Sequence, residues 1–240
     1  MFIFTKPIHR KGITVLKQSK YLIWMKLDKS IFNFKRNIYR CFVYIKPFQS
    51  KDLSETIFSE LQSDITVYSS LGDILISGDF NARAGGLADF IQNDSIHDNF
   101  IDCPLPTHYV PDTPLKRCQL DDQYNLNGNI LTNICISSQL RIANGRFIGD
   151  SLGYLTFFNN NGKSTVDFAL ASQELFYDLK NFQVHPPTEI SDHCLISFDF
   201  SCYYQIENEV DLEVWSPPDK FTCPERNKDS FVDSLLLQDN

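Results

Sequence analysis

The 240-residue sequence has no Cys-x-x-Cys pair, no long apolar run, and only two methionines and two tryptophans. Its seven cysteines are odd in number and scattered, which favours free thiols in a reducing compartment and argues against a zinc site. The opening MFIFTKPIHR is too short an apolar run for a signal peptide, because Lys6 and Pro7 interrupt it. No stretch approaches the length of a membrane span. We therefore expect a nuclear or cytoplasmic protein that is not secreted and has no membrane partner.

Acidic residues are nearly absent from one region, although the whole chain carries a net charge of -8. Residues 1–51 hold 12 of the 22 Lys and Arg and a single acid, Asp28. Such a basic region can bind nucleic-acid phosphates by electrostatic attraction. Lysines also protect exposed edge strands from pairing with other chains. Charge alone favours edge protection, and both interpretations stay open.

Phenylalanine and tyrosine are abundant, and this composition favours a strand-rich interior. The apolar pattern predicts strands over residues 12–27, 37–47, 73–77, 153–158, 164–172 and 191–204. Helical spacing predicts one helix around residues 53–65 and a second from residue 126 to about residue 144. Residues 104–114 are proline-rich and predict a surface loop, and the acidic residues 206–240 predict a linker or tail.

Polar residues stand where three predicted strands enter or leave the core. In ILISGDFNARAG, Asp79 and Asn81 follow an apolar run, and Asp167 interrupts another in STVDFALAS. Asp192 and His193 immediately precede the alternating strand of SDHCLISFDF. Each motif alone has an ordinary explanation, because Gly-Asp-x-Asn is a common turn and a lone histidine is usually structural.

Together the motifs fit a metal-dependent hydrolytic site. If Asp79 and Asp192 lie about 4 Å apart, their repulsion is about 4 kcal/mol at an effective dielectric of about 20. A divalent cation offsets such repulsion, and Mg²⁺ typically binds through one or two carboxylates plus substrate phosphate oxygens. A histidine held by a further carboxylate is a candidate general base or phosphate-polarising group.

Three motifs, SGDFNARAG, STVDFALAS and SDHCLISF, resemble in their order the signatures of the endonuclease/exonuclease/phosphatase superfamily. The segment NGRFIGDSLGYLTFFNNNGKSTVDF is most similar to the endonuclease domain of non-LTR retrotransposons, which nicks target DNA before reverse transcription. The tail WSPPDKFTCPERNKDSFVDSLL resembles the connector toward the reverse transcriptase in those elements. The resemblance implies Mg²⁺-dependent endonuclease activity, with Mn²⁺ as an alternative metal. It also implies DNA and a reverse transcriptase domain as partners.

The resemblance also implies an architecture and a domain division. The expected fold is α/β, with two mainly antiparallel β-sheets packed face to face and flanked by helices as a four-layer sandwich. Residues 1–205 correspond to the endonuclease domain, and residues 206–240 to the tail. Because the family's opening Asn and metal-binding Glu have no counterpart ahead of Asp28, we expect a copy that is missing its first strands.

Matching the motifs assigns roles to five candidate catalytic residues. Tyr44 is expected to contact the scissile phosphate. Asp79 is expected to activate or orient the attacking water, with Asn81 helping to fix the phosphate. Asp167 would orient His193, which would accept a proton or stabilise charge on the phosphate.

Three further residues complete the implied site. Asp192 would serve the metal, Ser191 would support its loop on the substrate side, and Thr156 would line the DNA-binding surface. Leu195 and Phe168 are mild departures, since proline and tyrosine are commoner at these positions.

The absent Glu predicts impaired cleavage. The alternative is an inactive retrotransposon fragment that retains at most nucleic-acid binding. An inositol-phosphate phosphatase or sphingomyelinase is a third option, but the sequence around Asp167 lacks the inositol-enzyme context.

Overall fold

The computed structural model describes residues 10–47, 51–92, 111–160 and 162–201. All of them belong to one compact unit, Met1–Tyr203. Most of the predicted proline-rich loop and the whole predicted tail, residues 206–240, lie outside the described residues. The predicted domain boundary therefore stays a prediction.

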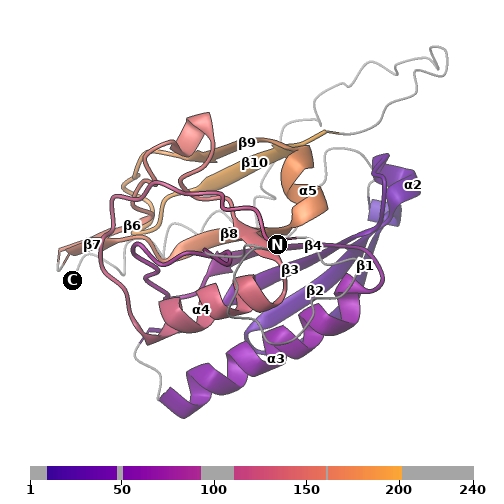
Figure 1. The fold of residues 1–240 in the computed structure, drawn as a ribbon, viewed down its shortest axis with the longest axis horizontal. Coiled ribbons are helices and arrows are strands. Elements are labelled where there is room, and N and C mark those ends of the chain that lie inside the picture. Colours follow the sequence, from indigo (N-terminus) through magenta and orange to yellow (C-terminus); the bar gives the residue numbers. More distant parts are fainter. Residues whose placement is uncertain (1–9, 48–50, 93–110, 161, 202–240) are drawn as a thin grey trace, which may run out of the picture. The chain divides into compact units, whose positions relative to one another are not determined.

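A six-stranded mixed sheet forms the centre of the molecule (Figure 1). Its order is β1 (Ile13–Gln18), β2 (Leu22–Leu27), β3 (Ile38–Tyr44), β4 (Asp73–Asp79), β8 (Asp167–Ser172) and β5 (Leu140–Ile142). Strands β3 and β4 are parallel, and the other neighbouring pairs are antiparallel. The fold is therefore mixed α/β, in agreement with the predicted class.

The predicted single strand over residues 12–27 is instead a hairpin of two strands. The chain reverses after β1, where the hydroxyl of Ser19 accepts hydrogen bonds from the backbone N–H groups of Tyr21 and Leu22. A serine that bonds nearby backbone groups competes with strand pairing, which explains the turn. Apolar residues continue on both sides of this turn, so the sequence pattern does not indicate where the chain reverses.

Two helices cover one face of the sheet (Figure 1). In α3 (Lys51–Ser69), the apolar residues Ile57, Leu61 and Ile65 are all buried, and they confirm the predicted helical spacing. The second helix, α4 (Leu126–Ser137), is shorter than predicted, since the left-handed Gln139 (φ 52°) follows it. Leu140, which the apolar spacing assigns to the predicted helix, belongs instead to β5 and is buried there. These helices and the sheet enclose the larger core cluster, which includes Trp24, Phe58 and Phe168.

Smaller elements lie beyond the other face of the sheet (Figure 1). A two-stranded sheet joins β9 (Leu179–Val184) to β10 (Ile196–Phe200), and α5 (Gln173–Asp178) packs with it in a second core cluster. A hairpin joins β6 (Phe157–Asn159) and β7 (Gly162–Ser164), and short turns form α2 (Lys29–Phe32) and a 3₁₀ helix (Ile148–Asp150). Among the described residues, β9 and β10 form one two-stranded sheet of this layer and β6 and β7 another, so the predicted pair of large packed sheets stays a prediction.

Two lysines of the β1–β2 hairpin have carboxylate partners within the fold. Lys17, on the edge strand β1, lies 2.9 Å from Glu60 and 2.7 Å from Asp64 of α3. Lys26 lies 3.2 Å from Asp28. Both pairs reduce the charge that these side chains can offer to a phosphate, and Lys17 alone stands on an edge strand, as edge protection requires.

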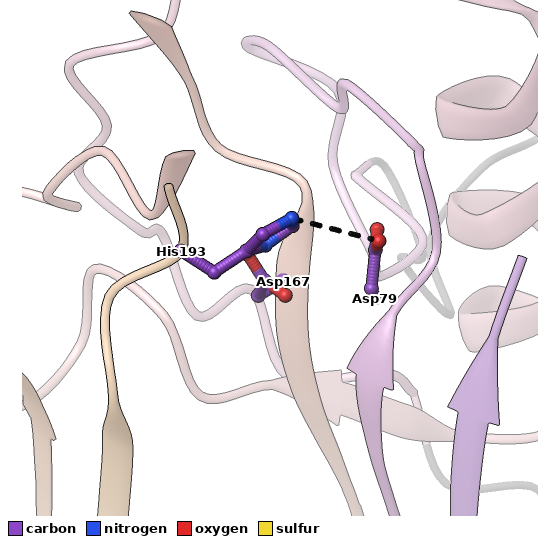
Figure 2. A group of neighbouring side chains, drawn as sticks. All are labelled: Asp79, Asp167 and His193. Carbon is purple, nitrogen blue, oxygen red and sulfur yellow. Dashed lines mark hydrogen bonds and ion pairs between the residues drawn. The ribbon is translucent and has the colours of Figure 1, made fainter. Parts of the chain in front are cut away.

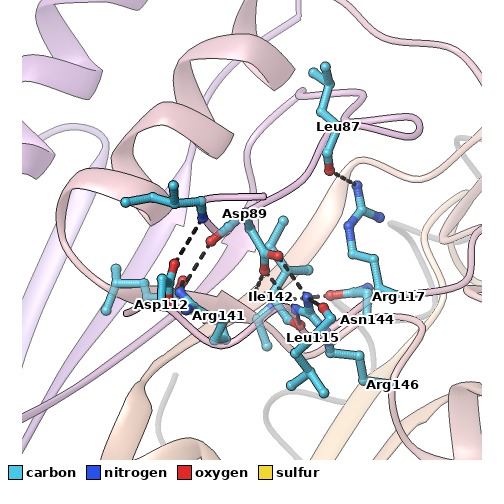
Figure 3. Close-up of polar contacts among 12 residues, drawn as sticks. Leu87, Asp89, Asp112, Leu115, Arg117, Arg141, Ile142, Asn144 and Arg146 are labelled. Atoms are coloured by element: carbon cyan, nitrogen blue, oxygen red, sulfur yellow. Dashed lines mark hydrogen bonds and ion pairs between the residues drawn. The ribbon is translucent and has the colours of Figure 1, made fainter. Parts of the chain in front are cut away.

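An ionic network fixes the loops beside β5 (Figure 3). Asp89 is fully buried, and its two carboxylate oxygens accept hydrogen bonds of 2.6 and 2.7 Å from the guanidinium of Arg146. The same carboxylate accepts from the backbone N–H of Ile142 at 2.7 Å. The neighbouring Arg141 donates to the backbone carbonyl of Asp89 and pairs with Asp112. The network therefore ties the loop that contains Asp89 and the loop that contains Asp112 to the sheet.

Across the described helices, none is both long enough and apolar enough to cross a lipid bilayer.

Candidate functional site

Three side chains from separate parts of the sequence meet at one end of the sheet (Figure 2). Asp79 is the last residue of β4, Asp167 is the first of β8, and His193 lies three residues before β10. One possible ligand atom from each lies within 4.8 Å of the others. The structure thus brings Asp79, Asp167 and His193 together, with Asp167 within hydrogen-bond distance of His193 as expected, whereas the Asp192 carboxylate, expected to converge on Asp79 and His193, is not part of this group.

Strand pairing explains why the two carboxylates are neighbours. Strands β4 and β8 are antiparallel, and Asp79 is paired directly with Asp167. Such partners have side chains on the same side of a sheet. Gly78 permits the close approach of β3, since a Cβ at this position would lie 2.0 Å from the carbonyl oxygen of Val43. Its φ of 148° also favours glycine.

Asn81 supports the Asp79 carboxylate. Its backbone N–H donates to Asp79 Oδ1 at 2.9 Å, and its side-chain amide donates to the two carboxylate oxygens at 3.1 and 3.2 Å. The same amide donates to the carbonyl of Ile45, just after β3. Asn81 has a left-handed backbone (φ 43°), which asparagine tolerates better than most residues. The turn thus holds the carboxylate in place.

His193 is held from two sides. Its Nδ1 lies 2.9 Å from Oδ2 of Asp167, and its Nε2 lies 3.9 Å from Oδ2 of Asp79. The ring of Phe157 packs against it with a centroid distance of 4.8 Å. Because an ionised carboxylate only accepts hydrogen bonds, a neutral His193 carries its proton on Nδ1. The unprotonated Nε2 then faces Asp79.

Burial raises the pKa of both carboxylates. The pKa of Asp79 rises to about 6, mainly because the group is buried, and the negative charge of Asp167 raises it further. Burial also raises the pKa of Asp167, although hydrogen bonds with His193 and Thr156 oppose this effect. Two neighbouring, desolvated carboxylates are a suitable donor set for a hard cation such as Mg²⁺.

The remaining predicted residues lie around this group. Tyr44 is paired with Asp79 at the end of β3, and it is half exposed. The hydroxyl of Ser191 accepts a hydrogen bond of 3.1 Å from the backbone N–H of His193. Asp192 is exposed, its backbone carbonyl accepts from Phe158, and its side chain is not in the described three-residue group. Its role as the metal ligand stays a prediction.

Thr156 lies beneath the site and not on a surface. It is fully buried, and its hydroxyl accepts hydrogen bonds of 3.1 Å from the backbone N–H groups of Val166 and Asp167. Its carbonyl accepts from the backbone N–H of Cys194, which follows His193. Thr156 therefore links the segments that carry Asp167 and His193. Neither this support nor the packing of Phe157 on His193 has a signal in the sequence beyond the strand pattern.

The chain is similar to known proteins in its structure. No protein family model and no curated protein sequence matches the chain. The endonuclease domain of TRAS1, a telomere-specific non-LTR retrotransposon, matches with a TM-score of 0.50 and 13% identity over 78% of this chain and 68% of that one. Over 78% of its length the chain therefore has a fold like that of this endonuclease domain.

Two other solved structures are similar to the chain in fold. The 3'-5' exonuclease NExo from Neisseria meningitidis matches with a TM-score of 0.50 and 15% identity, over 78% of this chain and 70% of that one. The Neisseria 3' phosphatase NExo bound to product DNA hairpin matches with a TM-score of 0.50 and 14% identity, over 80% of this chain and 71% of that one. At such identities the likeness concerns the fold alone.

The raised pKa of Asp79 predicts that this residue destabilises the metal-free protein. Its folded pKa of about 6 exceeds the ordinary value of 3.8, so its contribution to stability falls as the pH rises from 4 to 6. In EDTA at pH 7.5 we expect Asp79→Asn to increase the free energy of unfolding by on the order of 2 kcal/mol. Urea denaturation should show a smaller gain at pH 4.

The control for this prediction is Asp199→Asn, which changes an exposed carboxylate on β10. This variant should leave stability unchanged at both pH values. An Asp79→Asn effect of equal size at pH 4 and 7.5 would show that desolvation of the charged group is not its cause.

Proposed function

We propose that this protein is a metal-dependent hydrolase that cleaves phosphodiester bonds in DNA, as a nicking endonuclease of the retrotransposon type. The observation that carries the proposal is His193 held by Asp167 at 2.9 Å, with Nε2 facing the buried Asp79 carboxylate. This arrangement gives a proton acceptor next to a carboxylate that can orient water. The match to a phosphatase structure bound to product DNA hairpin supports DNA as the substrate class.

The chain's own residues supply most of the proposed chemistry. Asp79 orients the attacking water, and the Asn81 amide keeps that carboxylate in place. Asp167 holds the proton on Nδ1 of His193, so that Nε2 accepts a proton or, once protonated, stabilises negative charge on the phosphate. Tyr44, half exposed at the end of β3, contacts the scissile phosphate.

Mg²⁺, or Mn²⁺ in its place, fits the donor set of this site. Asp79 and Asp167 provide desolvated carboxylate oxygens, and the exposed Asp192 lies next to His193 in the chain. The bound ion would supply positive charge that stabilises the phosphate as negative charge develops on it.

A groove of about 540 Å³ adjoins the site and suits a phosphodiester backbone. Asn81 and Val166 line it beside the site, together with Lys46, Arg83 and Asn127. None of the described residues lining it carries a carboxylate, although the chain as a whole is acidic. Arg83 is paired with Asp121, whereas Lys46 forms no ion pair with the residues that the structure describes and supplies positive charge to the groove. Phosphate binding at such a surface does not require a basic protein.

Two finer parts of the proposal rest on the family resemblance. A four-layer sandwich is proposed for the fold, and a reverse transcriptase domain for the partner. The Glu expected to hold the metal has no counterpart in the described group at Asp79. We therefore expect slow cleavage by the 240-residue chain. The alternative, an inactive fragment that retains at most nucleic-acid binding, predicts DNA binding without cutting.

Nicking of supercoiled plasmid tests the proposal. With Mg²⁺ or Mn²⁺ the chain should convert supercoiled DNA to the open-circular form, and EDTA should stop the reaction. His193→Gln should lower the rate about 100-fold or more, since acid–base groups typically contribute 10²–10⁴. His185→Gln is the matched control, because this histidine bonds Ser197 outside the site.

Nicking that persists in EDTA, or that His193→Gln leaves unchanged, would contradict the proposal. A gel-shift measurement with the same DNA separates the two candidate functions. Binding of DNA with no metal-dependent nicking would favour the inactive fragment.

A further inference from the structure

Arg83, two residues after Asn81 of the site, has a guanidinium that is held along one edge. Its Nε donates to Oδ2 of Asp121 at 2.9 Å, and its Nη2 donates to Oδ1 of the same carboxylate. Asp121 is 5% exposed, and its oxygens also accept from the backbone N–H groups of Gln123 and Thr165. A buried and fully bonded carboxylate therefore fixes the guanidinium in place.

The backbone of Arg83 is fixed as well. Its N–H donates to the side-chain oxygen of Asn125 at 3.0 Å, and its carbonyl accepts from the backbone N–H of Asn125 at 3.0 Å. Asn125 is the N-cap of α4, where the same side-chain oxygen accepts from the N–H of Gly128. A side chain that is already held at both ends loses little further freedom when it binds a ligand, so Arg83 is pre-organised.

The second edge of the guanidinium is available at a groove. A guanidinium carries five N–H donors in a planar fork, and the Asp121 carboxylate uses only those of Nε and Nη2 that face it. Nη1 forms no hydrogen bond with the residues that the structure describes, and the side chain is 33% exposed. Arg83 lines the groove of about 540 Å³ that Asn81 and Lys46 also line. Nη1 and Nη2 can therefore donate to a ligand while Asp121 keeps its hold.

The charges around Arg83 indicate which kind of contact it can make. The hydrogen bond to Asp121 raises the pKa of Arg83, so the guanidinium stays charged, and the exposed Asp122 adds a second negative charge nearby. Net charge alone therefore attracts an anion only weakly to this place. The planar fork still offers two parallel hydrogen bonds, a geometry that matches the oxygens of a phosphate group. Arg83 is thus suited to short-range gripping of a phosphate that other groups bring to the groove.

Resting on the proposed function, we propose that Arg83 is a substrate-binding residue whose Nη1 and Nη2 donate to a DNA backbone phosphate flanking the scissile one. Asp121 is the positioning residue that fixes this fork. The flanking phosphate follows from the groove, because Asn81, which supports the Asp79 carboxylate, lines it together with Arg83. Lys46, in the same groove, supplies the charge that draws the phosphate in.

Binding of a labelled DNA duplex in EDTA, followed by fluorescence anisotropy, tests the contact without any cleavage. We expect Arg83→Met to weaken binding about tenfold or more, the scale typical of hydrogen bonds to a charged group. Arg83→Lys should recover little of this loss, because an ammonium keeps the charge and lacks the fork. The matched control is Arg36→Met, which breaks another Arg–Asp pair, 3.2 Å from Asp73 at the start of β4, and should leave the affinity unchanged.

Asp121→Asn and Asp122→Asn separate positioning from charge. Each variant removes one negative charge near Arg83, so a purely electrostatic effect would make both bind DNA more tightly. If Asp121 positions the fork, Asp121→Asn should instead weaken binding, whereas Asp122→Asn should strengthen it or leave it unchanged. Tighter binding by both variants would remove Asp121 from this role. The Arg83 variants test the phosphate contact even where Asp121→Asn fails to fold.

Equal affinity of Arg83→Met and the unchanged protein, or full recovery in Arg83→Lys, would overturn the proposal. The plasmid-nicking assay keeps this result apart from the proposed function. Nicking by a chain whose DNA affinity does not depend on Arg83 refutes the phosphate contact alone, and Arg83-dependent binding without nicking refutes the hydrolase alone. In the nicking reaction, Arg83→Met should raise KM about tenfold and leave kcat unchanged, since the contact is made in the ground state and the transition state alike.

Discussion

The Asp167→Asn variant is expected to lose about 10²–10⁴-fold in the rate of DNA cleavage while keeping its fold. Asp167 accepts a hydrogen bond from Nδ1 of His193 at 2.9 Å and so keeps Nε2 unprotonated on the side of Asp79. An asparagine amide can donate to Nδ1 instead, which favours the tautomer with its proton on Nε2. That tautomer cannot accept a proton from the attacking water.

Rates on a fluorescent duplex across pH 5.5–9 would measure this effect. Asp167 acts through His193, so the variant should also shift the acidic limb of the pH–rate profile, which a purely structural loss would not do. The control is Asp199→Asn, an exposed carboxylate on β10 that should leave the rate unchanged. A rate within threefold of the unchanged protein, with the same pH profile, would remove Asp167 from the mechanism.

The site is the part of this structure that the sequence predicts best. Asp79, Asp167 and His193 stand next to apolar runs that form β4, β8 and β10, so their place at strand ends follows from the pattern. Their convergence depends on which strands pair, and the local pattern does not contain that information. The order of the three motifs, through the family resemblance, provided it.

Other elements were mispredicted for specific physical reasons. The alternation in residues 12–27 is the same whether the chain continues or reverses at Ser19, so a hairpin resembles one strand. Leu140 and Ile142 continue the helical apolar spacing of α4, but they face the core from β5. The stretch that forms α5 and β9 was not assigned, because its apolar residues fit neither period over a long enough run.

The hydrogen bonds that hold the site residues in place could not be predicted from residue types. Thr156 sits in an ordinary strand-like segment, and only the folded chain shows its hydroxyl beneath Asp167. The predicted proximity of the Asp192 carboxylate to Asp79 depended on the conformation of a turn. In the structure Asp192 is exposed and its carbonyl is bonded to Phe158. Side-chain direction at a turn is set by tertiary contacts that a linear pattern does not record.

The Asp89→Ala variant is expected to lower the free energy of unfolding by about 3–5 kcal/mol, the cost typical of breaking one side of a buried ion pair. Asp89 is fully buried, and its loss leaves the guanidinium of Arg146, itself 2% exposed, without its two carboxylate bonds. The backbone N–H of Ile142 loses its acceptor as well. Since domains are stable by only about 5–15 kcal/mol, this loss is a large fraction of the total stability.

Urea denaturation followed by far-UV circular dichroism measures this loss. Asp122→Ala is the matched control, because it removes an exposed carboxylate and should change stability by less than about 0.5 kcal/mol. The double variant Asp89→Ala/Arg146→Met tests the cause. If the cost comes from an unpaired buried charge, removing the guanidinium as well should recover part of the stability lost in Asp89→Ala. A double variant that is as unstable as the sum of the two single variants would instead mean that Asp89 acts through its bond to Ile142 and the packing of its loop.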